Sequence, residues 1–420
     1  MFSRRSLLTG SLALIFTPAT AAFAQQVAQQ AEWQQNYEAV SRIRVRRTTT
    51  PMLSAETLAA TQQTIDHYHG LAARGGWPML RVSAGLRLGV KSPEVIALRQ
   101  RLIITGDLDP AAGESPVYDS YVEAGVRRFQ ARHGLSATGA MSAPTLAAMN
   151  VPVDVRLRQL ELNVVRLRTH SGNLGRRHVV VNIPAALVET VEDGMVHTRH
   201  AAGVGKSDRQ SPVMNSKVVE VNFNPFWTVP ASIIRKDLIP KMQKEPNYLT
   251  DNKIRIFRGD EELDPARVNW FSDEATRYRF RQDPGGELNS MGFVRINIPN
   301  PHGVYMHDTP SKGIFGDDFR FVSSGCVRVQ NVRDYIEWLL KDTPGWSREQ
   351  IDATFKSGER IDARLSQAVP IYWVYVTAWA TPDGLVQFRD DIYNKDGFGN
   401  AIPVASRVPT EPDEEMFLQN

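Results

Sequence analysis

The chain has 420 residues, a formal net charge of +3 and a single cysteine. Basic residues are interspersed with acidic ones, so the charge pattern predicts no nucleic-acid partner. One cysteine leaves no internal disulfide, and a chain of this length supplies ordinary hydrophobic cores for two or three domains.

Residues 1–24 have the pattern of a signal peptide. Arg4 and Arg5 form a basic start, an apolar stretch follows, and Ala22-Phe23-Ala24 is a small-x-small cleavage site. The apolar stretch is shorter than the ~20 residues of a membrane-spanning helix, and Pro18 interrupts it. We therefore expect export to the periplasm, and both the general secretory route and the twin-arginine route fit the pattern.

The next three segments are predicted to be helical. Residues 25–90 form an N-terminal scaffold segment with a helix over 54–70, residues 91–150 a module of three helices, and residues 151–176 a linking helix with apolar positions at three- and four-residue steps. The string VRRFQARHGL at 126–135 resembles the small three-helix peptidoglycan-binding domain. This resemblance implies that the module binds glycan, and a scaffolding role is the alternative.

Residues 177–395 are predicted to be a β-rich sandwich, which makes the whole chain α+β. Short apolar runs alternate with turn signals, among them Asp193-Gly194 at a hairpin and the run IYWVYVTAWA at 371–380 as a late strand. A helix is expected over 332–340 with Asn331 as its N-cap. An insertion over about 226–288 has the length of a lid, and residues 396–420 read as a flexible tail.

Cys326 is the candidate nucleophile, and His307 is the candidate base that takes its proton. Gly325 permits close approach to the sulfur and a backbone N–H directed at an oxyanion. Arg328 lies on the same side as Cys326 if the segment is a strand, where its charge favours the thiolate. The alternative for a lone cysteine is a small buried hydrophobic residue.

The segments His307-Asp308-Thr309 and SSGCVRVQN at 323–331 resemble the signature of the L,D-transpeptidase (YkuD) catalytic domain, in its YcbB-type branch. Many members have a second histidine where this chain has Ser324, so the resemblance assigns the base to His307. It also implies a capping subdomain over the active site, formed by the insertion. Residues expected to orient the reaction or form the oxyanion site are Gly325, Ser324, Tyr305 and Asp308. Residues expected to bind substrate are Arg328, Asn331, Trp227 and Arg279.

The resemblance implies acyl transfer through a thioester. Cys326 attacks the third residue of a peptidoglycan stem, D-Ala leaves, and an amine of a neighbouring stem completes a 3→3 cross-link. No cofactor and no metal is expected, protein partners are not predicted, and β-lactams of the carbapenem type are expected inhibitors. The same acyl-enzyme resolved by water gives an L,D-carboxypeptidase, and resolved by another amine it attaches a protein to the wall. The alternative that is not an enzyme is a non-catalytic peptidoglycan-binding protein.

Overall fold

The computed structural model describes residues 48–83, 85–170, 172–284 and 288–399. The expected signal peptide and nearly all of the expected tail lie outside these ranges. By its contacts the chain divides into residues 1–47 and 48–420, and the described residues all belong to the second unit. Within the described ranges, no helix combines the length and the apolar character that a membrane crossing requires.

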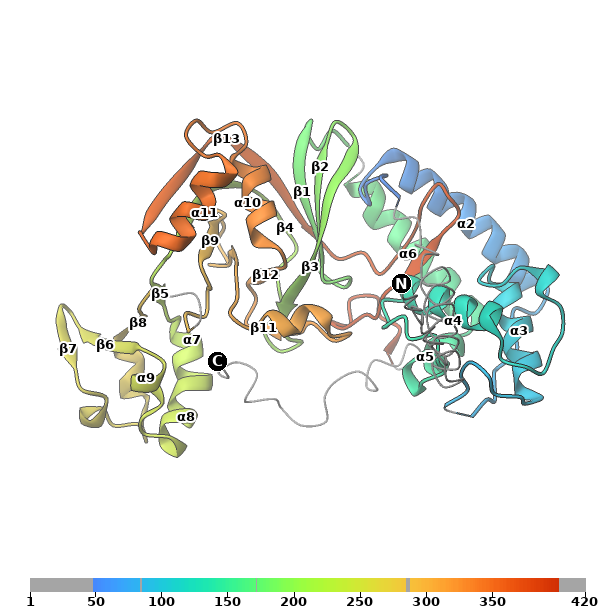
Figure 1. The fold of residues 1–420 in the computed structure, drawn as a ribbon, viewed down its shortest axis with the longest axis horizontal. Coiled ribbons are helices and arrows are strands. Elements are labelled where there is room, and N and C mark those ends of the chain that lie inside the picture. The colour runs from blue at the N-terminus through green and yellow to red at the C-terminus, as the bar shows by residue number, and fades with distance from the viewer. Residues whose placement is uncertain (1–47, 84, 171, 285–287, 400–420) are drawn as a thin grey trace, which may run out of the picture. The chain divides into compact units, whose positions relative to one another are not determined.

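A closed sheet forms the centre of residues 177–374 (Figure 1). The strand order is β11-β3-β12-β10-β9-β4-β13-β1-β2, and β2 also pairs with β3, so the sheet closes on itself with β11 attached to β3. Its strands are β1 (Arg177–Asn182), β2 (Leu187–Glu192), β3 (Met195–Gly205), β4 (Met214–Phe223), β9 (Val294–Asn297), β10 (Met306–His307), β11 (Phe321–Ser323), β12 (Val327–Val329) and β13 (Ile361–Val374). The α+β class is confirmed. The predicted hairpin is present as well, with Asp193 and Gly194 at φ 50° and 75° between β2 and β3.

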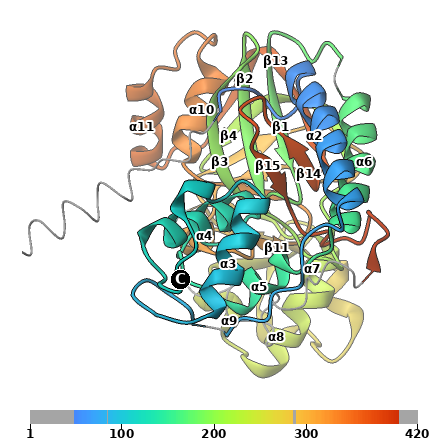
Figure 2. The same cartoon turned by 90° about the vertical axis from the view of Figure 1, so that its right-hand side faces the viewer.

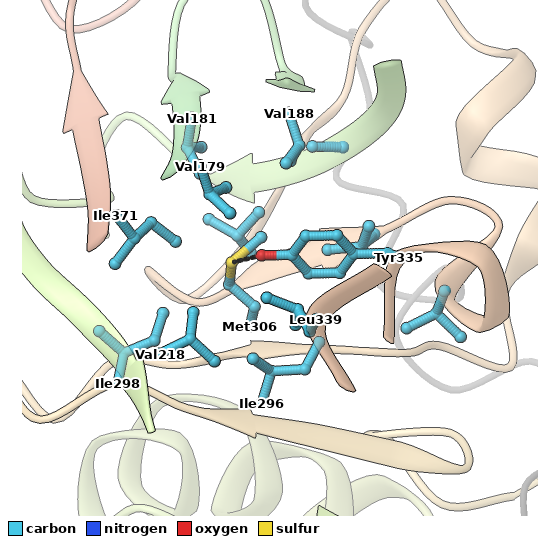
Figure 3. Packing of buried hydrophobic residues seen from close by; sticks show 14 of the residues in the cluster. Val179, Val181, Val188, Val218, Ile296, Ile298, Met306, Tyr335, Leu339 and Ile371 are labelled. Atoms are coloured by element: carbon cyan, nitrogen blue, oxygen red, sulfur yellow. Dashed lines mark hydrogen bonds between the residues drawn. The ribbon is translucent and has the colours of Figure 1, made fainter. Parts of the chain in front are cut away.

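The core of this sheet decides which strand faces remain for chemistry. Helix α10 (Val332–Leu340), followed by α11 (Arg348–Ser357), packs its apolar face onto the sheet. In Figure 3 Met306 of β10 lies among core side chains, and the Tyr335 hydroxyl of α10 donates to its sulfur at 3.5 Å. Since side chains alternate along a strand, the neighbours of Met306 in the chain must face away from this core.

The insertion forms a separate small body, here called the cap (residues 227–282). Its sheet has the order β5-β8-β6-β7, and its buried side chains form a hydrophobic core of their own. The elements, drawn in yellow-green in Figure 1, are β5 (Trp227–Thr228), α7 (Ala231–Ile233), the π-helical turn η2 (Ile234–Leu238), α8 (Ile239–Lys244), α9 (Tyr248–Asp251), β6 (Ile254–Arg258), β7 (Glu261–Leu263), the 3₁₀ turns η3 (Pro265–Arg267) and η4 (Asp273–Arg277), and β8 (Arg279–Gln282). Pro240 has no N–H to donate, which fits the widened turn that precedes it.

Helices from the N-terminal part of the chain pack against a hairpin formed by residues 378–388. Figures 1 and 2 both show α2 (Ala55–Ala73) and α6 (Val153–Thr169) side by side. The hairpin of β14 (Ala378–Ala380) and β15 (Val386–Phe388) packs against them. The remaining helices are α3 (Glu94–Ile104), the short 3₁₀ turn η1 (Pro110–Ala112), α4 (Ser120–Arg132) and α5 (Ala143–Met149).

The single strand predicted over 371–380 is wrong. β13 ends at Val374, and β14 begins at Ala378 in a different sheet. Asn163 of α6 accepts the N–H of Thr377 at 2.8 Å, and Thr61 of α2 accepts the N–H of Ala380 at 3.0 Å. Because these helices supply the hydrogen bonds that a continuing strand would have found in the sheet, the chain leaves the sheet at this point.

Candidate active site

Strands β10 and β12 bring the two candidate catalytic residues to one face. The strands pair in parallel, with Met306 opposite Val327 and His307 opposite Arg328. Met306 and Val327 are fully buried in the core. Alternation along both strands therefore turns four side chains to the other face, where they line one pocket: Tyr305, His307, Cys326 and Arg328.

The pocket has a volume of about 290 Å³ and is walled on one side by the cap. Its cap side includes Trp227, and the cationic residues of its wall are Lys206, Lys236, Lys241, Lys244 and Arg328. Among the described residues of that wall Asp237 is the one acid, so this part of the lining favours an anionic ligand. In the part of the chain that the structure describes, no group of three or more His, Cys, Asp or Glu side chains is arranged to hold a metal ion.

Cys326 rests as a protonated thiol. The side chain is half-buried in the turn between β11 and β12, and burial raises its pKa to about 11. The main-chain N–H and the hydroxyl of Tyr305 hydrogen-bond the sulfur, and the charges of Arg295 and Arg328 add to their effect, so these groups lower the pKa of the thiol by less than burial raises it. The expected support of the thiolate by Arg328 is thus present, but the desolvation penalty exceeds it.

His307 rests as a neutral imidazole with a defined tautomer. Its Nδ1 contacts the main-chain oxygen of Asp308, which can only accept, so Nδ1 carries the proton and Nε2 keeps its lone pair. Burial, and next the charge of Arg328, lower the pKa of His307 to about 3. His307 and Cys326 line the same pocket, and no hydrogen bond joins them among the described contacts.

The cysteine turn is built around a left-handed glycine. Gly325 has φ +113°, and a Cβ there would lie 3.3 Å from the oxygen of Gln210. The Ser323 hydroxyl accepts the N–H of Gly325 at 3.1 Å and donates to the oxygen of Cys326 at 2.6 Å. The N–H of Gly325 is therefore engaged. That of Cys326 has no partner in the described parts of the chain, which makes it the candidate oxyanion donor.

Asp308 and Ser324, both expected to orient His307, take other positions. The Asp308 carboxylate accepts the N–H of Phe293 at 3.1 Å and pairs with Lys312, so only its main-chain oxygen orients the imidazole. Ser324 accepts a hydrogen bond from Arg209 at 3.0 Å, and none joins it to His307.

Trp227, which was expected to bind substrate, lies where the pocket meets the core of the cap. It lines the pocket, it packs partly against the core of the cap, and it hydrogen-bonds the Tyr305 hydroxyl. Its indole therefore joins the cap to the residue that contacts the cysteine sulfur.

Two of the expected substrate-binding residues lie outside the pocket lining. Asn331 is exposed with a left-handed backbone (φ 49°), and its side chain makes no capping hydrogen bond to α10. Arg279 is exposed on β8, where it stacks on Phe257 at 5.1 Å and donates to the oxygen of Gly259 at 3.1 Å.

Arg295 is a site residue that the sequence did not single out. It lies opposite His307 on β9, and its guanidinium is 4.6 Å from the centroid of the Tyr305 ring. Its charge lowers the pKa of both His307 and Cys326. An arginine between the apolar residues Val294 and Ile296 was the available signal, since that alternation turns it away from the core.

Comparison with known proteins agrees with this geometry. Residues 176–346 match the family of L,D-transpeptidase catalytic domains, and residues 91–149 match the family described as a putative peptidoglycan binding domain. A protein of Haemophilus influenzae described as "Putative L,D-transpeptidase" is 34% identical over 262 residues, which are 61% of this chain and 50% of that protein. The chain thus spans half the length of this relative. Residues 176–346 are therefore similar to L,D-transpeptidase catalytic domains, and residues 91–149, which precede them, are similar to a peptidoglycan-binding domain.

Two solved structures share lower similarity. An L,D-transpeptidase from Stackebrandtia nassauensis is 11% identical, with 70% of this chain and 97% of that chain covered and a TM-score of 0.27. L,D-transpeptidase 3 from Mycobacterium tuberculosis, in complex with a faropenem-derived adduct, is 12% identical, with 47% and 60% covered and a TM-score of 0.23.

Proposed function

We propose that this protein is an L,D-transpeptidase that forms 3→3 cross-links in peptidoglycan and releases D-Ala from tetrapeptide stems. The observation that carries the proposal is the common face of β10 and β12, which presents Cys326 and His307 to one cationic pocket. A stem peptide carries several carboxylates, and the basic wall of the pocket suits such a ligand.

The first half of the reaction forms the thioester. Sγ of Cys326 attacks the carbonyl carbon of the third stem residue while Nε2 of His307 takes the thiol proton. The N–H of Cys326 donates to the oxygen that becomes negative. The bond to D-Ala then breaks, and His307 returns the proton to the leaving amine.

The second half transfers the acyl group. The side-chain amine of a neighbouring stem attacks the thioester, His307 accepts a proton from that amine, and the released sulfur recovers it as a thiol. One amide bond is broken and one is formed, so no oxidant, reductant or energy source is needed.

The resting protonation states make proton transfer and attack concerted. With a base of pKa about 3 and a thiol of pKa about 11, a separated imidazolium–thiolate pair is unfavourable in the free enzyme. A substrate carboxylate beside Arg328 would offset the charge that is the second cause of the low pKa of His307. Substrate binding would thereby strengthen the base at the moment when it is required.

Two features outside the pocket complete the proposal. The module at 91–149 holds glycan, which keeps the catalytic domain near its substrate, and the predicted export signal delivers the protein to the periplasm. Carbapenem-type β-lactams acylate Cys326, because their strained carbonyl is open to the same attack. Binding of the folded Cys326→Ala protein to purified sacculi tests the glycan-binding part separately from turnover.

The test of function is product analysis with a purified disaccharide-tetrapeptide. The wild-type protein is expected to release D-Ala and to yield cross-linked dimers, and Cys326→Ala to yield neither. Tripeptide stems without dimers would instead identify a carboxypeptidase. Transfer only to a protein amine would identify wall attachment, and D-Ala release by a folded Cys326→Ala protein would refute the cysteine mechanism.

A further inference from the structure

An arginine outside the catalytic strands connects the cap to the cysteine turn. Arg209 lies in the segment between β3 and β4. Its two terminal nitrogens bind the carboxylate of Asp237 at 2.6 and 2.8 Å, and one of them also donates to the hydroxyl of Ser324 at 3.0 Å. Asp237 belongs to the π-helical turn of the cap, and Ser324 lies two residues before Cys326. One guanidinium thus contacts both walls of the pocket.

The main chain around Arg209 is fixed against the cysteine turn. The hydroxyl of Ser211 accepts the N–H of Gly205 at 3.0 Å and donates to the oxygen of Gly325 at 2.9 Å. The N–H of Lys206 donates to the oxygen of Ser323 at 2.9 Å. A Cβ at Gly205 would lie 2.3 Å from the oxygen of Arg209, so the loop folds tightly back on itself. Arg209 is consequently anchored on the sheet side, and its side chain reaches out to the cap.

The ion pair has the features of a specific contact. The Arg209 side chain is 17% exposed and that of Asp237 37%, and the bidentate geometry is the strong form of an arginine–carboxylate pair. Asp237 is also the one acid among the described residues of the cationic pocket wall. Its pairing with Arg209 neutralises a charge that would otherwise repel an anionic peptide.

We propose that Arg209 is a positioning residue that couples closure of the cap to the geometry of the cysteine turn. The inference rests on the proposed function for its meaning, since a cap over a stem-peptide site must open for substrate and close for reaction. The cap has its own hydrophobic core and is able to move as a body. The contact with Asp237 holds it closed, and the contact with Ser324 transmits that state to the turn bearing Cys326.

The test uses the only cysteine of the full chain as a reporter. The alkylation rate of Cys326 is measured with iodoacetamide and with a bulky neutral maleimide. The ratio of the two rates cancels the fraction of thiolate and reports access past the cap. Asp237→Asn, Arg209→Gln and the double variant are compared with Glu262→Gln. That control removes a cap carboxylate whose pair with Arg255 lies within the cap and outside the pocket lining.

The ratio of the maleimide rate to the iodoacetamide rate is expected to rise roughly tenfold in Asp237→Asn and in Arg209→Gln, which corresponds to the loss of one strong ion pair. The double variant should equal the single ones because the two changes break the same contact, and Glu262→Gln should match wild type. A wild-type ratio in both single variants, or an equal rise in the control, would overturn the proposal. If Arg209→Gln does not fold, the ratio measured for Asp237→Asn decides the question, because Asp237 is partly exposed and its replacement is easier to accommodate.

The same variants separate this inference from the proposed function. With a tetrapeptide stem, the rate constant for D-Ala release is expected to fall in Asp237→Asn and not in Glu262→Gln. A changed alkylation ratio in a protein whose wild type releases no D-Ala would refute the proposed reaction and leave the coupling in place. Normal D-Ala release with an unchanged ratio would refute the coupling alone.

Discussion

Replacing Tyr305 by phenylalanine removes the hydroxyl next to the sulfur of Cys326 and keeps the aromatic ring. That hydroxyl donates to the sulfur of Cys326 and helps to lower a thiol pKa that burial has raised to about 11. A hydrogen bond to a charged group contributes roughly 1.5–3 kcal/mol. The loss should therefore reduce the thiolate fraction at a given pH by about 10- to 100-fold.

The assay is the second-order rate of alkylation by iodoacetamide, followed from pH 7 to 10. Cys326 is the only thiol in the chain, so every alkylated molecule reports on it. The matched control is Tyr335→Phe, which removes the hydroxyl that donates to Met306 on the core face of the same strand (Figure 3). Tyr305→Phe should be alkylated more slowly than wild type at each pH, and Tyr335→Phe should be alkylated at the wild-type rate. Equal rates in all three proteins would refute the assignment of Tyr305.

Three further outcomes follow from the same contacts. Cys326→Ala should abolish turnover and shift the thermal midpoint by only a few degrees, because a small half-buried side chain is removed; calorimetry and D-Ala release check both parts. Gly325→Ala should cost about 1–3 kcal/mol in urea unfolding, since it forces a side chain into φ +113° beside Gln210. Folded His307 has a pKa of about 3, below the ~6.5 of an unfolded histidine. The stability that the neutral imidazole gives is therefore complete above pH ~6.5, and it falls as the pH drops toward 3. The stability of wild type relative to His307→Gln in urea titrations should therefore fall as the pH is lowered from 7 to 4, and a pH-independent difference would contradict the burial of a neutral imidazole.

The spacing of apolar residues was sufficient to predict two of the helices. The linking helix over 153–169 lies within the predicted segment 151–176, and the helix over 332–340 has the predicted bounds, because their apolar spacing agrees with their surroundings. The end of β13 was not predictable in this way. It depends on Asn163 and Thr61, which are more than 200 residues away in the sequence and compete for the backbone of residues 377–380.

The site likewise contains residues that local sequence predicts and residues that only the tertiary fold brings in. Cys326 and His307 stand in recognisable local strings, whereas Arg295 joins them only through the register of β9 with β10. Arg209 reaches Ser324 across 115 residues of sequence, through a loop whose fold no local pattern specifies. Arg279 was expected to bind substrate, but the pairing of β8 with β6 places it opposite Phe257.

The central claim is that Cys326 carries the stem as a thioester, and intact-mass spectrometry of the protein with a disaccharide-tetrapeptide tests it most directly. The claim predicts a mass increase equal to the stem without its terminal D-Ala, located on the peptide that contains Cys326, with one D-Ala released per adduct. The adduct should disappear when an acceptor stem is added, and cross-linked dimer should form in its place. A folded protein that releases D-Ala without an adduct in rapid-quench samples, or that carries the adduct on another residue, would contradict the account.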